Sequence, residues 1–302
     1  MTRSFILGNP RSGTSLLRIM LNSHPHIAAP PECGFLQWWY GRYGDWTVTD
    51  YEQEDLLSEF ADDVLASRKM ETWKLDKGVL INALRKQEPA SYGEACSIVY
   101  QVWYDINTSD FDKALRAIVD KNNYYINHLE EIDSIWPDAK YIFMTRDGRD
   151  VAASYLDLQD VETDSPYAPN LPSSIKEIAD EWIANNKRTM AFLAAKSDKQ
   201  HLWVRYEDLV REPESTLREV LSFIDASYRE VIHRYYLHNH EPDATIDWKQ
   251  RTLQPPDSSR IGRYLTRLTS EEIETFESRA ASLLNLLGYT GNSSIESNPP
   301  IS

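Results

Sequence analysis

Short apolar runs alternate with longer amphipathic segments over most of the chain. Each run is brief and is followed by turn-forming or charged residues, which is typical of a buried strand. The predicted strands cover residues 4–8, 117–119, 140–144 and 202–206. Between them, apolar residues recur at helical spacing. The predicted helices cover residues 14–22, 54–69, 77–86, 122–135, 148–158 and 173–195, and a further helix opens near Pro213.

Strands that alternate with helices predict an α/β fold of the P-loop nucleotide-binding type, with a central parallel sheet covered by helices on both faces. The 302 residues contain no internal repeat and no linker rich in Gly and Ser. We therefore expect one domain over residues 1–290 and a flexible tail over 291–302, where Asn, Ser and Pro are frequent. Residues 157–174, which are rich in prolines and acids, are interpreted as an insertion or lid.

The chain is strongly acidic, with a formal net charge of −15. Such a surface repels polyanions, so we expect no nucleic-acid partner. If the chain binds a phosphorylated nucleotide, its scarce cations must gather where the phosphates lie. The sequence gives no indication of the oligomeric state.

The cysteines and histidines give no pattern of a disulfide framework or a metal site. Cys33 and Cys96 lie far apart without a zinc-binding spacing, as expected in a reducing compartment. His233, His238 and His240 lie close together, but no carboxylate or cysteine completes a metal site. No signal peptide precedes the first predicted strand, and no window has the length of a membrane span. We expect a cytoplasmic protein that needs no metal.

A phosphate loop is predicted at residues 8–15, GNPRSGTS, between the first strand and the first helix. Its two glycines have the P-loop spacing, and a loop in this position presents backbone N–H groups and a helix N-terminus to an anion. A nucleoside triphosphatase needs Lys directly after the second glycine, where this chain has Thr14. The cation lies inside the loop, at Arg11, which suits a smaller anionic group. The alternative is a plain turn with a surface arginine.

A second anion site is predicted after the strand at 140–144. Arg146 follows this strand, at the end where α/β sheets bind ligands, and Ser154 lies about two helical turns further on. An arginine and a hydroxyl there could hold a second phosphate. The alternative is that Asp147 caps a helix while Arg149 and Asp150 form surface ion pairs.

Both segments resemble motifs of the sulfotransferase family. PRSGTSLL at 10–17 is similar to its 5′-phosphosulfate loop, and YIFMTRDGRDVAAS at 141–154 is similar to its 3′-phosphate motif. The resemblance implies the donor 3′-phosphoadenosine 5′-phosphosulfate (PAPS), with Arg146 and Ser154 at its 3′-phosphate and Arg11 beside the bridging oxygen that leaves. The loop residues implied to bind the donor are Arg11, Ser12, Gly13, Thr14, Ser15 and Leu16.

Two later segments extend the resemblance. RYEDL at 205–209 is similar to a family segment whose tyrosine, Tyr206 here, approaches the adenine. SRIGRY at 259–264 resembles the late basic loop that closes over the 3′-phosphate. The residues implied in that loop are Arg260, Ile261, Gly262 and Arg263. The alternative for this segment is an ordinary exposed loop.

The general base cannot be the histidine that cytosolic family members place two residues after a lysine, because Asn123 stands at that position after Lys121. Lys121 would remain as a charge stabiliser near the bridging oxygen. Another branch, which includes tyrosylprotein sulfotransferases, places a glutamate shortly after the first helix, and Glu32 occupies that place here. We expect Glu32 to be the base, with its pKa raised somewhat by burial. Alternatively, Glu32 caps a helix that begins at Phe35.

Other candidates surround Glu32 in the sequence. His24 and His26 are rival bases, although they are more typical of a helix-ending turn. Nearby aromatic residues either line an acceptor pocket or pack in the core. They are Trp38, Trp39, Tyr40, Tyr43 and Trp46.

The sequence thus predicts a sulfotransferase that acts by in-line displacement on a hydroxyl or amine of a small molecule, a carbohydrate or a peptide. One alternative is a small-molecule kinase, in which Asp120 would bind Mg²⁺. Another is a non-catalytic nucleotide-binding protein.

Overall fold

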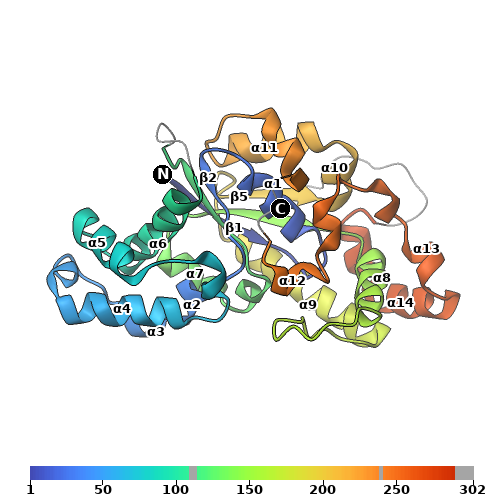
Figure 1. The fold of residues 1–302 in the computed structure, drawn as a ribbon. Coiled ribbons are helices and arrows are strands. Elements are labelled where there is room, and N and C mark those ends of the chain that lie inside the picture. Colours follow the sequence, from blue (N-terminus) through green and yellow to red (C-terminus); the bar gives the residue numbers. More distant parts are fainter. Residues whose placement is uncertain (109–113, 238–240, 290–302) are drawn as a thin grey trace.

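A computed structural model describes residues 1–108, 114–237 and 241–289 (Figure 1). Its centre is a five-stranded sheet in the order β2-β3-β1-β4-β5, in which all neighbouring strands run parallel. The strands are β1 (Thr2–Leu7), β2 (Ile27–Ala28), β3 (Ala117–Asp120), β4 (Lys140–Thr145) and β5 (His201–Arg205). The predicted α/β fold with a central parallel sheet is confirmed, and the four predicted strands are present. The two-residue strand β2 is too short to leave a pattern in the sequence.

Side chains alternate between the two faces of the sheet, as the pleat requires. Phe5 and Leu7 of β1 point into one apolar cluster, and Ile6 points into the other. In the register, Phe5 pairs with Asp120 of β3 and Leu7 pairs with Phe143 of β4. Both faces are therefore buried, which explains why the strands are apolar throughout.

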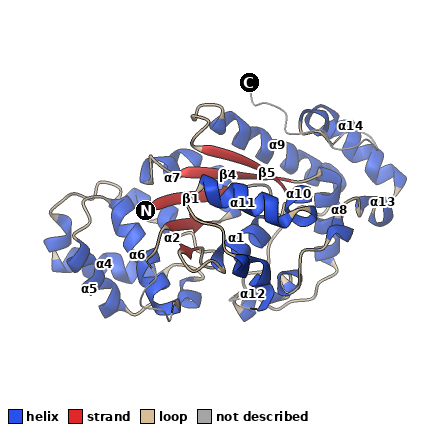
Figure 2. Cartoon of the chain, turned by 90° about the horizontal axis from the view of Figure 1, so that it is seen from above, coloured by secondary structure: helices blue, strands red, loops and turns tan. Residues whose placement is uncertain are grey.

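Helices cover both faces of the sheet and extend beyond it at each end. The strands run side by side through the centre with helices around them (Figure 2). Figure 1 shows α3, α4 and α5 gathered at one end of the molecule, and α8, α13 and α14 at the other. The α-helices are α1 (Thr14–Asn22), α2 (Phe35–Trp38), α3 (Tyr40–Tyr43), α4 (Glu54–Ala66), α5 (Lys77–Gln87), α6 (Tyr92–Asn107), α7 (Leu129–Ile135), α8 (Gly148–Gln159), α9 (Ile175–Leu193), α10 (Tyr206–Arg211), α11 (Pro213–Phe223), α12 (Asp243–Ile246), α13 (Tyr264–Arg267) and α14 (Ser270–Leu286). The 3₁₀ helices are η1 (Asp50–Glu52), η2 (Met70–Trp73), η3 (Asn123–Asn127), η4 (Glu230–Leu237), η5 (Gln250–Leu253) and η6 (Ser258–Arg260).

Some helix predictions differ from the structure. The helix predicted over 122–135 is broken into η3 and α7, because the Asn122 side chain accepts a hydrogen bond from the Tyr124 amide and His128 leaves the helical region. The predicted strand over 202–206 ends one residue early, since Tyr206 begins α10. Helix α6 lies outside the predicted elements; most of its residues are buried, and they leave a narrow polar face at Glu94, Gln101 and Asp105.

The C-terminal helix is joined to the sheet region by packing and by hydrogen bonds from Arg149 and Arg205 to backbone carbonyls that follow the helix. α14 packs along α9 and α8. The carbonyl of Tyr289, the last described residue, accepts a hydrogen bond from Arg149 Nη2 at 2.8 Å. The predicted tail over 291–302 lies outside the described residues, so the boundary of the domain stays a prediction.

Candidate active site

The phosphate loop turns sharply between β1 and α1, and its two glycines make the turn possible. Gly13 has a left-handed backbone with φ of +91°, and a Cβ there would lie 2.5 Å from Cδ2 of Tyr206. A Cβ on Gly8 would lie 2.6 Å from the carbonyl oxygen of Met144. Only glycine allows both this backbone and these close approaches.

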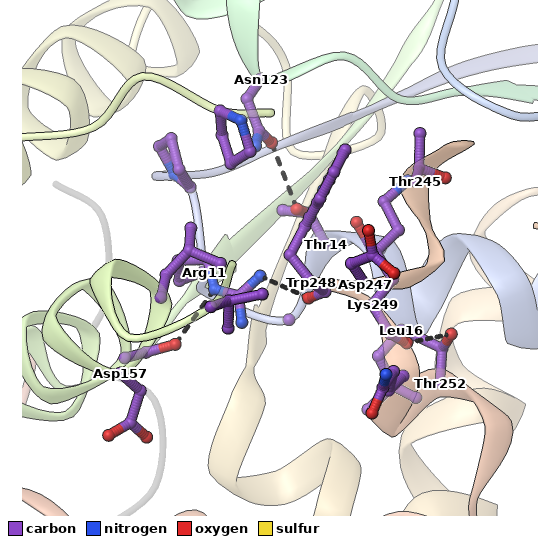
Figure 3. A pocket seen from close by; sticks show the side chains of 18 of the residues that line it. Arg11, Thr14, Leu16, Asn123, Asp157, Thr245, Asp247, Trp248, Lys249 and Thr252 are labelled. Carbon is purple, nitrogen blue, oxygen red and sulfur yellow. Dashed lines mark hydrogen bonds between the residues drawn. The ribbon is translucent and has the colours of Figure 1, made fainter. Parts of the chain in front are cut away.

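The segments predicted to bind the donor meet at the carboxyl edge of the sheet, where open α/β sheets bind their ligands. The phosphate loop follows β1, Lys121 follows β3, Arg146 follows β4 and Tyr206 follows β5. A pocket of about 1000 Å³ lies at this edge (Figure 3). The predicted site residues among its lining are Arg11, Gly13, Thr14, Ser15, Leu16, Glu32, Lys121, Arg146, Ser154, Tyr206, Arg260 and Arg263.

Arg146 holds the phosphate loop and the late basic loop together. Its Nη1 donates to the carbonyl of Arg11 and its Nη2 to the carbonyl of Arg260, each at 3.0 Å. Its guanidinium lies over the ring of Tyr206, 4.2 Å from the ring centre. Within the described residues its buried Nε has no hydrogen-bond partner. A buried donor in this position is suited to an anionic ligand.

Arg11 links the two predicted anion sites. Its Nε donates to the hydroxyl of Ser154 at 3.0 Å, and its Nη1 donates to the carbonyl of Trp248 at 3.2 Å. Ser154 therefore bonds to the side chain of Arg11 in this structure, and Arg146 bonds to the backbone carbonyl of Arg11. Arg11 also has a positive φ of 68°, a conformation that costs a non-glycine residue energy and is concentrated at functional sites.

Two aspartates of α8 position the late basic loop. Asp150 accepts hydrogen bonds from the backbone amides of Gly262 and Tyr264, at 2.8 and 3.0 Å. Asp157 lies within 4 Å of three arginines. They are Arg260 at 3.3 Å, Arg263 at 2.9 Å and Arg267 at 3.0 Å. The segment is therefore an ordered basic clamp held by α8, and not a plain exposed loop.

Three predicted donor-binding residues are not among the described residues that line the pocket: Ser12, Ile261 and Gly262. Ser12 is buried beneath the phosphate loop. Ile261 packs against the apolar cluster on the α1 side of the sheet. Gly262 contributes its amide to Asp150. Donor binding by these three residues stays a prediction.

Glu32 lies in the pocket beside Lys121, as the resemblance implied. Its Oε1 pairs with Lys121 Nζ, and its Oε2 lies 3.5 Å from Lys69 Nζ. Lys121 Nζ also donates to the hydroxyl of Ser15 at 3.1 Å, which joins the pair to the phosphate loop. Helix α2 does begin at Phe35, but Gly34 is its N-cap. The helix-capping alternative for Glu32 is therefore wrong.

Three ammonium groups control the charge of Glu32. Burial alone would raise the pKa of this carboxyl, but Lys121, Lys249 and Lys69 hold the pKa well below its usual range. The expectation that burial raises this pKa is wrong, because the nearby cations outweigh the loss of solvent. Burial lowers the pKa of Lys121 to about 8, although Glu32 opposes that shift. Glu32 is thus ionised at neutral pH and able to accept a proton.

Comparison with known proteins agrees with this geometry. The family model described as "Sulfotransferase family" matches residues 4–230. The chain belongs to the sulfotransferase family. It is therefore an enzyme with sulfotransferase activity, and the α/β fold described above is a sulfotransferase fold.

A curated relative agrees with this assignment, and two solved structures share the fold. Protein-tyrosine sulfotransferase A of Caenorhabditis elegans is 22% identical, over 98% of this chain and 68% of the relative. The sulfotransferase domain of the Synechococcus PCC 7002 olefin synthase has a TM-score of 0.56 at 23% identity, covering 93% of this chain and 94% of that one. The sulfotransferase domain of the curacin biosynthetic pathway has a TM-score of 0.58 at 21% identity, covering 93% and 97%. The structural likeness concerns the fold.

Asp120, the residue that a kinase would use for Mg²⁺, is engaged elsewhere in this sulfotransferase. Its side chain is fully buried at the end of β3. One carboxylate oxygen accepts the Lys121 amide at 2.8 Å, and the other accepts the hydroxyl of Tyr125. With both oxygens bonded inside the protein, Asp120 is poorly placed to hold a metal with a nucleotide.

Sequence reasoning missed several residues that line the pocket of this sulfotransferase. Lys249 and Trp248 come from the irregular segment between α12 and η5, and Tyr167 comes from the predicted lid. Residues 167–171 also belong to the lining, so the lid borders the pocket. A lone lysine in an irregular segment carries no periodic or motif signal, and its position depends on tertiary packing.

The aromatic residues after Glu32 pack away from the pocket. Tyr43 and Trp46 belong to the core cluster around Phe60, and Trp39 packs against it. The interpretation of this group as an acceptor pocket is therefore wrong for the described side chains. The aromatic residues that do line the pocket are Tyr167, Tyr206, Tyr235 and Trp248.

The rival histidine bases are bonded to backbone carbonyls. The His24 ring lies 2.8 Å from the carbonyl of Ser227, and the His26 ring lies 3.1 Å from that of Ala114. Neither is among the described lining residues. Both histidines therefore fit the turn at the end of α1 better than a role in proton transfer.

The alternative interpretation of the segment after β4, in which Asp147 caps a helix and Arg149 and Asp150 form surface ion pairs, is partly correct. Asp147 does cap α8, accepting the amide of Arg149, and Arg149 pairs with Asp147 and Glu277. Asp150, in contrast, is buried and holds the late basic loop. Capping by Asp147 and anion binding by Arg146 can occur together.

Metal and membrane features were searched within the described residues. There, no cluster of at least three His, Cys, Asp or Glu side chains could hold a metal ion. His238 and His240 lie outside the described residues. Among the helices that the structure describes, none has both the length and the apolar character needed to cross a bilayer.

Proposed function

We propose that this sulfotransferase takes its sulfuryl group from PAPS and transfers it by in-line displacement to a hydroxyl or amine acceptor. The observation that carries the proposal is the pair of cationic sites at adjacent strand ends, the phosphate loop after β1 and Arg146 after β4. Two anion sites on neighbouring strands match one bisphosphorylated nucleotide. The acceptor belongs to a small molecule, a carbohydrate or a peptide.

The residues at the carboxyl edge fit such a donor. The backbone of the phosphate loop and the N-terminus of α1 suit the 5′-phosphosulfate end. Arg146, whose buried Nε has no partner among the described residues, suits the 3′-phosphate together with Arg260. Tyr206, which covers both Gly13 and the Arg146 guanidinium, has a flat ring suited to the adenine.

Each charged side chain then has a role in transfer. Glu32 accepts the proton of the acceptor hydroxyl or amine. Lys121 and Arg11 stabilise the negative charge that develops on the bridging oxygen between sulfur and the 5′-phosphate. The late basic loop holds the nucleotide through Arg260 and Arg263. None of these steps needs a metal, so we propose that transfer is independent of metal ions.

Transfer of label from ³⁵S-labelled PAPS to a panel of phenols, sugars and tyrosyl peptides, with and without EDTA, tests the proposal. We expect labelled product in both conditions. A parallel incubation with γ-³²P-ATP and Mg²⁺ tests the kinase alternative, which the structure disfavours because Thr14 replaces the P-loop lysine and Asp120 is engaged. Phosphoryl transfer, or sulfuryl transfer abolished by EDTA, would contradict the proposal. A cytoplasmic location stays a prediction that cell fractionation can test.

A further inference from the structure

Lys249 is a buried lysine for which the roles assigned above leave no function. It lies in the segment that joins α12 to η5, and its side chain is 8% exposed. Its Nζ lies 2.5 Å from Oε2 of Glu241 and 3.7 Å from Oε1 of Glu32. Burying a lysine is unfavourable unless its charge is paired. In this chain the 47 acidic residues outnumber the 32 lysines and arginines.

Lys249 and Lys121 approach the same oxygen of Glu32 from two different elements. Lys121 follows β3, and both ammonium groups face Glu32 Oε1. Both lysines also line the pocket together with Arg11 (Figure 3 labels Lys249 and Arg11). Two ammonium groups and a guanidinium therefore surround the place where the phosphate loop would present a sulfate.

The buried charges of this network do not cancel. Glu241, whose side chain is fully buried, also pairs with Arg18 of α1. Lys69 also pairs with Glu32, and the fully buried Asp120 lies next to Lys121. The group thus contains four cations, Arg18, Lys69, Lys121 and Lys249, and three anions, Glu32, Glu241 and Asp120. A surplus of buried positive charge is unfavourable by itself and becomes favourable when an anion enters the pocket.

The segment that carries Lys249 is fastened to the phosphate loop. Trp248, the preceding residue, accepts a hydrogen bond through its carbonyl from Arg11 Nη1 at 3.2 Å. In Figure 3, the side chains of this segment lie across the pocket from Asp157. The position of Lys249 is therefore fixed relative to the loop that would hold the reacting sulfate.

We propose that Lys249 is a further catalytic residue. Its ammonium group pairs with Glu32 in the free enzyme and with the oxygens of the sulfuryl group during transfer. The inference rests on the proposed function, because it requires a sulfated donor in the phosphate loop. Before the donor binds, Glu32 occupies the place of the sulfate as partner of the two lysines. When Lys249 turns to the sulfuryl oxygens, Glu32 loses one of its counter-ions. The affinity of Glu32 for a proton therefore rises at the step in which it acts as the base.

The atoms and charges balance in this step. The acceptor oxygen forms a bond to sulfur while the bond from sulfur to the bridging oxygen breaks. The electron pair of that bond leaves with the 5′-phosphate, giving adenosine 3′,5′-bisphosphate (PAP). The acceptor proton moves to Glu32, and Lys121 and Lys249 keep their protons throughout.

The groups that face Glu32 determine how its titration should respond to loss of Lys249. They are Lys121, Lys249 and Lys69, with Arg18 and Asp120 further away. The three lysines lower the pKa of Glu32 against the effect of burial. Removing the Lys249 charge raises the pKa of Glu32 in the free enzyme.

The test compares wild type with Lys249→Met, which keeps the length of the side chain and removes its charge. Turnover is measured as release of ³⁵S-sulfate from PAPS to water, which does not require the natural acceptor. We expect turnover to fall about 100-fold, as for loss of one transition-state donor, while the Kd for PAP stays within about twofold because PAP lacks the sulfuryl group. The acidic limb of the kcat/KM profile should move to higher pH, a shift that a merely structural role would not produce.

Lys196→Met is the matched control, because Lys196 is another mostly buried lysine, 15% exposed and 2.5 Å from Asp133, outside the described pocket lining. It should keep wild-type turnover. If Lys249→Met does not fold, Lys249→Arg and Lys249→Gln make the same comparison, since both keep a donor toward Glu241. The arginine variant should then retain about tenfold more turnover per folded molecule than the glutamine variant.

Wild-type turnover in Lys249→Met with normal PAP binding, or equal turnover in the arginine and glutamine variants, would overturn the inference. Neither result affects the proposed function, which fails if the wild-type enzyme does not bind PAP, transfers no label from PAPS, transfers phosphoryl groups instead, or loses sulfuryl transfer in EDTA.

Discussion

Glu32 shows how a carboxylate can be kept ionised in a mostly enclosed site. Its side chain is 16% exposed, and three lysines from three different segments surround it. The cost of moving the charge away from water is offset by these ammonium groups. Burial lowers the pKa of both Lys121 and Lys249 to about 8. The base and its stabilising cations therefore titrate as one coupled group.

The first prediction is the pH dependence of kcat/KM, which reports groups of the free enzyme. Glu32 must be ionised, and its lowered pKa places the acidic limb below the usual range of a carboxyl. Lys121 must be protonated, so activity should decline as the pH rises through about 8. Turnover assays across buffers of matched ionic strength check this profile. A basic limb near the usual pKa of an exposed lysine would contradict the described environment.

The second prediction concerns the Glu32→Gln variant, which keeps the shape of the side chain and removes its basicity. We expect turnover to fall about 100- to 10,000-fold, the usual contribution of a general base. Calorimetry should show PAP binding that is retained, because Glu32 faces the sulfate end of the pocket. Unchanged turnover would show that another group accepts the proton.

At the scale of elements, the site consists of loops that follow the strands and are held by helices packed behind them. Gly13 lets the phosphate loop pass beneath Tyr206 at the start of α10. Asp150 and Asp157 of α8 hold the late basic loop in place. The loops are thus preorganised by contacts between elements that lie far apart in the sequence, which reduces the ordering needed when a nucleotide binds.

The third prediction tests the phosphate loop with Gly13→Ala. The new Cβ combines a left-handed backbone with a contact of 2.5 Å to the Tyr206 ring, so the free energy of unfolding should fall by about 1–3 kcal/mol. PAP binding should weaken as well. Gly41→Ala is the control, since its Cβ meets nothing within 4 Å in the described residues, and it should be neutral or slightly stabilising. Thermal unfolding and calorimetry measure both effects. Equal stability of the two variants would contradict the described turn.

The fourth prediction tests the basic clamp with Asp157→Asn. Loss of its charge should release Arg260 and Arg263 and raise the Kd for PAP about tenfold, which corresponds to about 1.4 kcal/mol. Asp160→Asn is the control. Asp160 is 75% exposed, and its ion pair in the described residues is with Arg267, which does not line the described pocket. Tighter PAP binding by Asp157→Asn would instead show that this carboxylate competes with the nucleotide.

At the scale of the whole molecule, an acidic protein concentrates cations at one edge of its sheet. Much of this arrangement could be predicted from the sequence, because apolar runs predict the strands and the residues after each strand fall at the same edge. Arg11, Lys121 and Arg146 follow predicted strands, whereas Glu32 was located through the family resemblance, and the structure places all four in one pocket.

The remaining features depend on packing that no local pattern encodes. Helix α6 was not predicted, since most of its residues are buried and its polar face is narrow. Lys249 meets Glu32 only because the segment after α12 folds back over the phosphate loop. The lowered pKa of Glu32 could not be predicted either, since Lys249 had no assigned position and Lys69 was predicted only as the last residue of a helix.

The central claim is that two anion sites, one after β1 and one after β4, bind opposite ends of a single nucleotide. Isothermal calorimetry of PAP and of adenosine 5′-monophosphate, with wild type and Arg146→Ala, tests it most directly. PAP should bind wild type at least about tenfold more tightly than the monophosphate, since charged hydrogen bonds to the 3′-phosphate contribute about 1.5–3 kcal/mol, and Arg146→Ala should remove most of that difference. Equal affinity of wild type for the two nucleotides would contradict the account.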